Sequence, residues 1–247
     1  MDRVIYIAMT GAREVTRQQA VVTHNLANVS TQGCKQQLSV FRALPVVGPG
    51  AKTRAYVMET TPRTDLSHGA MQPTGRPMDV AVHGAGWIAV QDAAGNEAYT
   101  RMGNLQVSLN GILQTTGGFN VLGEGAPIAV PPEQEVHIAK DGTVSSAPLG
   151  QGMNQITVNG RIKLVNPAET DLVRGDDGLF RQQNGQSAAA DANVILASGT
   201  LEASNVNPAE ALVNMVSLAR QFEMNMQVLH YAEQNHQSAD KVLALTA

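Results

Sequence analysis

The N-terminal residues carry hydrophobic side chains at alternating spacings of three and four, which is the repeat of one face of an α-helix. The stripe consists of Ile5, Ala8, Ala12, Val15, Gln19, Val22, Leu26 and Val29, with Met9 beside it. All but Gln19 are apolar, and an average spacing of 3.5 residues is the seam of a coiled coil. We therefore expect an N-terminal helix that ends in the turn-favouring stretch 28–33.

The C-terminal residues give a second helix with a clear start. Asn207 suits the N-cap and Pro208 the first helical position, where its missing N–H costs nothing. A second hydrophobic seam follows, made of Leu212, Met215, Ala219, Phe222, Met226 and Leu229. We predict a helix over 208–243, about 54 Å long at 1.5 Å per residue.

The middle of the chain has a different sequence pattern from the two ends. Residues 34–77 contain five prolines and little periodicity, which predicts an extended connector. From residue 78 onward, short alternating runs predict strands, separated by tight turns such as Asn110–Gly111 and Asp141–Gly142. The runs are 87–91, 98–101, 105–109, 112–115, 135–139, 155–158, 161–165 and 179–181.

The predicted fold class is α+β, with a mostly antiparallel β domain inserted between N- and C-terminal coiled-coil-like helices. Residues 1–33 and 205–247 form the terminal helical assembly domain in this interpretation. Residues 34–77 form the extended connector, and 78–204 the β-rich outer domain.

The composition limits the classes of partner that the chain can have. The 17 Lys and Arg residues of the 247 are scattered and the net charge is −4, so we expect no nucleic-acid partner. No apolar run reaches the roughly 20 residues of a membrane span, so we expect no membrane insertion. Charges at Asp2, Arg13, Glu14 and Arg17 surround the short apolar run at the N-terminus, and we expect no cleaved signal peptide.

We find no constellation that carries catalysis. The single cysteine, Cys34, excludes an internal disulfide and a cysteine-cluster metal site. The six histidines do not have the spacing of metal ligands. Asp176-Asp177-Gly178 predicts a turn, because the rest of a calcium-binding loop is absent. With no carboxylate pair or activated nucleophile to nominate, we expect no enzyme, no cofactor and no metal.

The hydrophobic seams of the two terminal helices indicate instead that the chain assembles with other subunits. A lone helix is marginal in water and takes its stability from packing of its apolar face. Each terminal helix can cover one face of the other, but the C-terminal helix is longer, which leaves hydrophobic surface for other subunits. An ordinary helical hairpin packed on the β domain is the alternative. The candidate subunit-assembly residues are Ile5, Met9, Ala12, Val15, Val22, Asn25, Leu26, Asn28, Asn207, Leu212, Met215, Ala219, Phe222, Met226 and Leu229. Among them, Asn25 is the polar residue that we expect to fix register between neighbours.

Several motifs, in fixed order along the chain, resemble those of flagellar rod and hook proteins. They are Asn25-Leu-Ala-Asn-Val-Ser-Thr-Gln-Gly33, Arg76-Pro-Met-Asp-Val-Ala81, Gly86-Trp-Ile-Ala-Val90, Tyr99-Thr-Arg-Met-Gly-Asn-Leu105 and Leu201-Glu-Ala-Ser-Asn-Val-Asn-Pro208. One position departs from the pattern: the family usually has an aromatic residue after the first motif's glycine, where this chain has Cys34.

The resemblance implies a structural subunit of the bacterial flagellar basal-body rod, built through its terminal helices into a helical assembly with other rod subunits and copies of itself. It also implies secretion by the flagellar export apparatus, a place in the rod as it crosses the periplasm, and a share in transmitting torque from motor to hook. The opening residues 1–6 and the length are most similar to proximal rod proteins, with distal rod proteins as the alternative. Two other classes stay open: a periplasmic enzyme acting on cell wall, and a surface carbohydrate-binding module. The second would need clustered exposed aromatic residues, yet these make up only 4% of the chain and Trp87 is the sole tryptophan.

Overall fold

The computed structural model of the chain describes residues 2–45, 55–60, 63–132, 134–148 and 156–244. The chain divides into two compact units. We call Met1–Val29, Gln36–Asp65 and Val206–Ala247 the helical unit, and Ser30–Lys35 and Leu66–Asn205 the β unit. Both units are therefore built from separate stretches of the sequence, and the chain passes between them four times.

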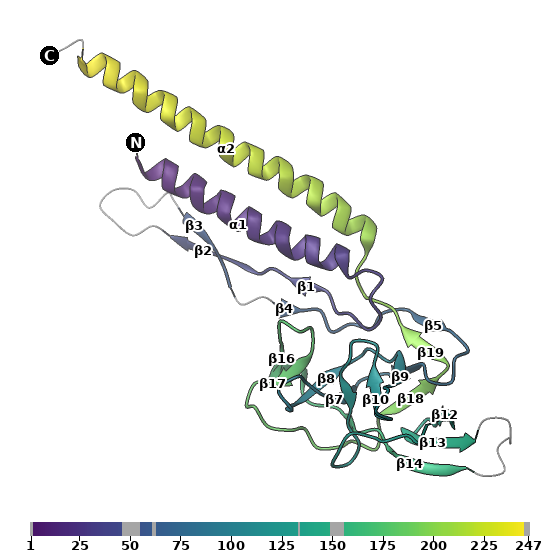
Figure 1. Cartoon of the computed structure of the whole chain (residues 1–247). Coiled ribbons are helices and arrows are strands. Elements are labelled where there is room, and N and C mark those ends of the chain that lie inside the picture. Colours follow the sequence, from purple (N-terminus) through teal and green to yellow (C-terminus); the bar gives the residue numbers. More distant parts are fainter. Residues whose placement is uncertain (1, 46–54, 61–62, 133, 149–155, 245–247) are drawn as a thin grey trace. The chain divides into compact units, whose positions relative to one another are not determined.

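In the helical unit, helix α1 (Asp2–Ala27) packs against α2 (Pro208–Ala244) on one side and against β3 on the other (Figure 1). Its four short strands form two antiparallel pairs. Strand β1 (Gln37–Leu38) pairs with β4 (Arg63–Thr64), and β2 (Phe41–Pro45) pairs with β3 (Ala55–Glu59).

Small side chains let the two helices approach closely. Ala8, Ala12 and Val15 of α1 are buried. A Cβ atom placed on Gly11 would lie 3.1 Å from Oδ1 of Asn225 on α2, so the contact at this point leaves little room for a side chain. Gly11, which the predicted stripe of α1 leaves out, thus marks a close approach of the two helices.

The predicted ends of the helices are confirmed. At the start of α2, Oδ1 of Asn207 accepts the Ala209 N–H at 3.1 Å, as an N-cap should. The helix has 37 residues, one more at its C-terminal end than the pattern predicts, and is about 56 Å long. At the end of α1, the side-chain amide of Asn28 donates to the backbone carbonyl of His24 at 2.9 Å.

The β unit contains one large antiparallel sheet, with strand order β16-β17-β8-β7-β11-β10-β9 and β15 also paired to β7. A three-stranded sheet β12-β13-β14 and the pairs β18–β6 and β19–β5 complete it. The bounds are β5 Met71–Pro73, β6 Val80–His83, β7 Trp87–Gln91, β8 Glu97–Thr100, β9 Leu105–Val107, β10 Leu113–Thr115, β11 Asn120–Val121, β12 Gln134–Ile138, β13 Thr143–Pro148, β14 Thr157–Arg161, β15 Leu164–Val165, β16 Leu172–Arg174, β17 Phe180–Gln182, β18 Ile195–Ser198 and β19 Thr200–Glu202.

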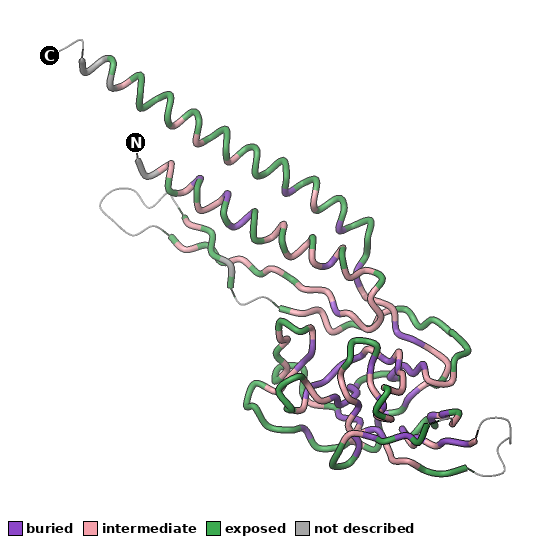
Figure 2. Tube along the Cα trace, viewed as in Figure 1, coloured by how far each residue is buried: buried purple, intermediate pink, exposed green. Residues whose placement is uncertain are grey.

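The core of the β unit lies on both faces of β7. Ile88 and Val90 belong to the main hydrophobic cluster, whereas Trp87 and Ala89 belong to a second cluster with Tyr99. Successive side chains of a strand point to opposite faces, so the short apolar run of β7 is covered on both sides. Figure 2 shows the buried residues concentrated in these strands, while α2 is exposed along most of its length.

The α+β class and the antiparallel pairing are confirmed, since all the strand pairs among the described residues are antiparallel. Strand β7 has the predicted bounds, and the two predicted turns, with Gly111 and Gly142 at positive φ, join β9 to β10 and β12 to β13. The predicted strand 155–158 is displaced, because β14 begins at Thr157. Its first residue, 155, lies outside the described residues.

In the region predicted as a connector, 34–77, the described residues carry strands β1 to β5. Four of these strands fall in the helical unit and β5 falls in the β unit. The units divide the chain differently from the predicted domains, because they take residues 36–65 into the helical unit and residues 30–35, 66–77 and 205 into the β unit.

Candidate assembly surface and signature cluster

The candidate assembly residues fall into three groups by burial in the single chain. Ala12, Val15 and Asn25 are buried. Ile5, Val22, Leu26, Asn28, Met215 and Leu229 are half-buried. Met9, Asn207, Leu212, Ala219, Phe222 and Met226 are exposed.

The seam predicted on α2 lies at the edge of its contact with α1. Ala211 and Leu218, which the prediction left out, are the buried residues of this helix among those whose burial is described. Leu212 is half exposed, and Phe222 and Met226 are between a third and a half exposed. The seam therefore meets α1 along one margin only.

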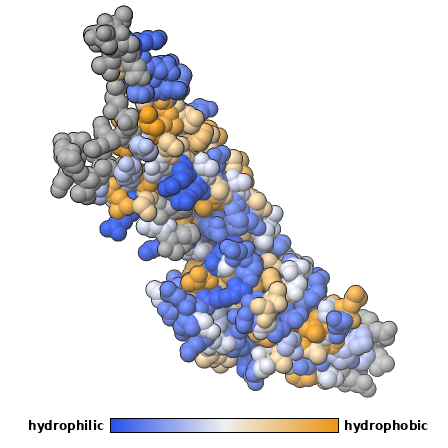
Figure 3. All heavy atoms as spheres, turned by 60° about the vertical axis from the view of Figure 1, so that its left-hand side comes forward, coloured by the Kyte–Doolittle hydropathy of each residue, from blue (hydrophilic) through white to orange (hydrophobic). Residues whose placement is uncertain are grey.

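A second hydrophobic stripe runs along α2. At 100° per residue, its members lie within about 60° of one direction, well away from Ala211 and Leu218. They are Val213, Val216, Met224 and Tyr231, all more than half exposed. Hydrophobic side chains thus reach the surface around the helix, and the space-filling view shows orange groups among hydrophilic ones (Figure 3). A helix that is hydrophobic all round is normally buried all round.

Asn25 joins the end of α1 to β1. Its Nδ2 donates to the Gln37 carbonyl at 2.8 Å, and its Oδ1 accepts the Gln37 N–H at 2.9 Å. The side-chain amide therefore satisfies both backbone groups of one residue, as a neighbouring strand would. This contact lies within the helical unit, and whether Asn25 also fixes the register of neighbouring subunits stays a prediction.

A buried charge cluster forms the other distinctive site. Its members are Lys35, Arg101 and Glu202 of the β unit. We call it the signature cluster because Arg101 and Glu202 lie in motifs quoted above and Lys35 lies two residues after another. Nζ of Lys35 lies 2.7 Å from Oε1 of Glu202, and a guanidinium nitrogen of Arg101 lies 3.0 Å from Oε2. The three side chains are 1%, 3% and 0% exposed, in the order Lys35, Arg101, Glu202.

Backbone groups complete the cluster. The Gly69 N–H donates to Glu202 at 2.9 Å, and Lys35 donates to the Ser67 carbonyl at 2.6 Å. Arg101 donates to the Gly84 carbonyl at 2.8 Å, and its guanidinium lies 5.3 Å from the ring centroid of Trp87. Buried charges are tolerated when each is paired and hydrogen-bonded, as here.

The charge of Glu202 is favoured despite its burial. Burial alone would raise the pKa of this carboxyl group. The hydrogen bonds from Lys35 and the Gly69 N–H, together with the positive charges of Lys35 and Arg101, outweigh burial and lower the pKa below its ordinary value. The cluster therefore holds one carboxylate between two cations.

Gly33 approaches the cluster through its backbone. Its N–H donates to the Glu202 carbonyl at 2.7 Å, and its φ is +66°. A Cβ atom here would overlap the backbone carbonyl of Arg101, so the residue needs both the left-handed conformation and the missing side chain. Cys34, which follows, is half-buried, with a guanidinium nitrogen of Arg174 3.8 Å from its sulfur.

Sequence reasoning missed the roles of Lys35, Arg101 and Glu202. The motifs that contain or adjoin them were the available signal, but charge in a motif does not indicate which residue it faces. Lys35 and Glu202 are 167 positions apart, and only the fold brings them together.

The described residues contain neither a candidate metal site nor a candidate membrane-spanning helix. Among them, no three His, Cys, Asp or Glu side chains lie close enough together to hold a metal ion. No helix in the same part of the chain has the length and hydrophobicity needed to cross a membrane.

Comparison with known proteins agrees with the resemblance. The profile of the family described as "Flagellar basal body rod FlgEFG protein C-terminal" matches residues 197–242. That of "Flagellar hook protein FlgE/F/G D1 domain" matches residues 81–146. The two matched segments contain Glu202 and Arg101 of the signature cluster.

Similar curated proteins match over all or nearly all of their length. The flagellar basal-body rod protein FlgF of Salmonella typhimurium is 44% identical over all of both chains, and FlgF of Escherichia coli is 43% identical over the same extent. The rod protein FlgG of Buchnera aphidicola is 30% identical, over 93% of this chain and 95% of its own. The chain therefore belongs to the family of flagellar basal-body rod proteins, is similar to FlgF among them, and is a structural subunit of the rod rather than an enzyme.

Proposed function

We propose that the chain enters the rod through α1 and α2, whose exposed hydrophobic side chains are covered by helices of other rod subunits and of its own copies in coiled-coil-like contacts. The observation that carries this proposal is that hydrophobic side chains lie on every side of α2, while α1 covers only one side. Large exposed hydrophobic patches on a soluble chain mark sites of association.

The position and route of the subunit rest on the resemblance. Because the FlgF relatives named above are 44% and 43% identical and the FlgG relative is 30% identical, we favour the proximal rod over the distal rod. We further propose passage through the flagellar export apparatus without a cleaved signal peptide, a place within the periplasm, and a part in transmitting torque.

The carbohydrate-binding alternative finds no support in the β unit. Trp87 is 4% exposed and packs against Phe180, with ring centroids 4.6 Å apart. A sugar-binding platform needs an exposed aromatic face, and this one is already covered.

Amide hydrogen exchange tests the proposal. We would compare the purified chain with the same chain in isolated basal bodies, and we expect exchange to slow most over residues 212–231 of α2. Peptides from β7 serve as the control, because they are buried in the single chain and should be protected in both samples. Equal protection of α2 in both samples would contradict assembly through this helix.

A pair of substitutions gives a second test. Val213→Asp places a charge on the exposed stripe of α2, and we expect it to abolish incorporation into rods. Val173→Asp is the matched control, because Val173 is about half exposed on β16 of the β unit. Loss of incorporation with both variants, or with neither, would count against a specific role for the helical surface.

A further inference from the structure

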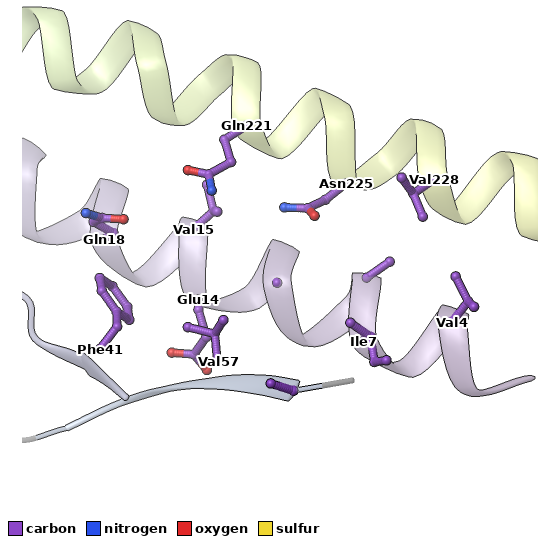
Figure 4. A pocket seen from close by; sticks show the side chains of 13 residues that line it. Val4, Ile7, Glu14, Val15, Gln18, Phe41, Val57, Gln221, Asn225 and Val228 are labelled. Atoms are coloured by element: carbon purple, nitrogen blue, oxygen red, sulfur yellow. The ribbon is translucent and has the colours of Figure 1, made fainter. Parts of the chain in front are cut away.

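A groove in the helical unit has features of a socket for another chain. It lies between α1, α2 and the β2–β3 hairpin and has a volume of about 450 Å³ (Figure 4). Its walls are mainly apolar, formed by residues such as Val4, Ile7, Val15, Phe41, Val57 and Val228. A water molecule takes up about 30 Å³ of liquid, so a groove of this size can take one long side chain in place of many waters.

Glu14 of α1 places a carboxylate in this apolar groove. Its side chain is 3% exposed, and Oε1 accepts hydrogen bonds from Arg13 at 3.1 Å and Arg17 at 3.4 Å, whose side chains are largely in solvent. The other oxygen, Oε2, is buried and has no hydrogen-bond partner in the described structure. A buried carboxylate oxygen without a partner is costly, so a donor supplied to Oε2 at this point would be stabilising.

The same chain displays a complementary group. Arg220 is exposed on the second hydrophobic stripe of α2, in a shallow apolar depression between Val216 and Met224. Within the described residues, this guanidinium has no ion pair or hydrogen bond. Arginine combines an apolar stem with five N–H donors, which suits an apolar groove that ends at a carboxylate.

Arg220 is directed away from the groove of its own chain. Gln221, Asn225 and Val228 are the α2 residues that line the groove. At 100° per residue, Arg220 is turned by roughly 80–140° from each of them. The donor surface and the socket therefore lie on different sides of one helix, as a head-to-tail contact between copies requires.

We propose that Arg220 of one copy enters the groove of the next copy and pairs with Glu14 there, while Val216 and Met224 beside it cover the apolar walls. This pairing rests on the proposed assembly through the terminal helices and names one contact within it. Because the two surfaces differ, the contact repeats from copy to copy, and it produces a ring or a helical filament instead of a closed dimer.

The pairing is tested by exchanging the two charges between protein chains, in cells from which the gene for this chain has been deleted. Alone, Glu14→Arg and Arg220→Glu should each lower the amount of full-length chain in isolated basal bodies at least ten-fold. Produced together as two differently tagged chains, they should restore incorporation to within about three-fold of wild type. Where the two chains alternate, the groove that carries Glu14→Arg meets Arg220→Glu of the other chain, and the unchanged Glu14 groove meets the unchanged Arg220, which a contact inside one chain cannot achieve.

The control variant has the net charge of the wild type, but its added positive charge lies at another site on α2. Glu210→Arg in the same chain as Arg220→Glu restores the total charge at an exposed site at the start of α2, and should not restore incorporation. If both single variants assemble normally, or if both fold but fail to assemble and co-production does not restore them, the pairing between copies is wrong. Normal assembly of Arg220→Glu beside failure of Val213→Asp would reject this contact and leave assembly through α2 intact.

A cross-linking experiment covers the case in which Glu14→Arg does not fold. Two chains carry Cys34→Ser, one with Gln18→Cys in the groove and the other with Ser217→Cys beside Arg220. We expect a short bis-maleimide to join them in isolated basal bodies, giving a product that contains both tags. Basal bodies that contain both chains without this product would overturn the proposal.

Discussion

Replacement of Gly33 by alanine tests the close approach at the signature cluster. Gly33 has φ +66°, and a methyl group would overlap the backbone carbonyl of Arg101. Gly75 is a matched control, because its φ is +72° and a Cβ atom there would meet nothing within 4 Å. Both alanine variants carry the cost of a left-handed residue, about 1–2 kcal/mol, but only one carries a steric clash.

The clash adds a second cost. Relief requires a shift of the backbone, which typically costs about 1–3 kcal/mol in a packed interior. The same shift would lengthen the 2.7 Å hydrogen bond from the Gly33 N–H to the Glu202 carbonyl and disturb Lys35 two residues later. We therefore expect Gly33→Ala to lower the free energy of unfolding by about 2–5 kcal/mol, and Gly75→Ala by about 1–2 kcal/mol.

Urea unfolding of the full chain measures this difference. Trp87 is the sole tryptophan, is buried in the β unit and lies 5.3 Å from the Arg101 guanidinium, so its fluorescence reports on the cluster itself. Equal losses of stability for the two variants would show that the backbones of Gly33 and Arg101 are not in close contact, and the reasoning would fail.

Three further predictions concern buried polar groups. Glu202→Gln should lower the free energy of unfolding in urea by about 3–5 kcal/mol, because it leaves two buried cations unpaired. The control Glu97→Gln, opposite the less buried Lys163, should lower it by about 1 kcal/mol or less. Similar losses for the two variants would contradict the importance of the buried carboxylate. Since the pKa of Glu202 is lowered by folding, its contribution is present above a glutamate's ordinary pKa of about 4.3 and is lost as pH falls through the folded value. The stability of the wild type should therefore fall more steeply in acid than that of Glu202→Gln. Burial raises the pKa of Tyr99 to about 12, so ultraviolet absorbance should show this tyrosine ionising only in strong alkali. The absorbance change that is lost in Tyr99→Phe identifies the signal of Tyr99. The hydroxyl of Tyr99 accepts the Ala188 N–H at 2.7 Å, and its loss should cost about 1–3 kcal/mol. Asn25→Ala should cost a similar amount and speed exchange of the Gln37 amide, whereas unchanged exchange would argue against the paired hydrogen bonds.

Local signals in the sequence predicted the elements well. Asn207 and Pro208 marked the start of α2 because capping depends on a few adjacent residues. The run of β7 and the glycine turns at Gly111 and Gly142 were equally local, and the structure has them where the pattern placed them.

The contact face of α2 was harder to predict. Spacings of three and four favoured the seam through Leu212 and Phe222, but hydrophobic residues lie on all sides of this helix, so several seams fit equally well. The buried residues Ala211 and Leu218 are selected by the position of α1, which no pattern on α2 records.

The signature cluster could not be predicted from spacing at all. Lys35, Arg101 and Glu202 each look like an ordinary surface charge in the sequence. Their burial depends on strand pairing, since β19 pairs with β5 and so brings Glu202 opposite Met71, near Gly69 and Ser67. Only the resemblance to a family drew attention to the motifs in and beside which they lie.

The separation of Lys35 from Glu202 along the chain also has a kinetic consequence. A chain that emerges from a ribosome or a narrow channel, N-terminus first, cannot close this ion pair until Glu202 has appeared, after more than four-fifths of the sequence. Closing a loop of 167 residues costs roughly 4–5 kcal/mol in entropy, and folds rich in such distant contacts form slowly. The β unit should therefore complete its fold only after most of the chain has emerged.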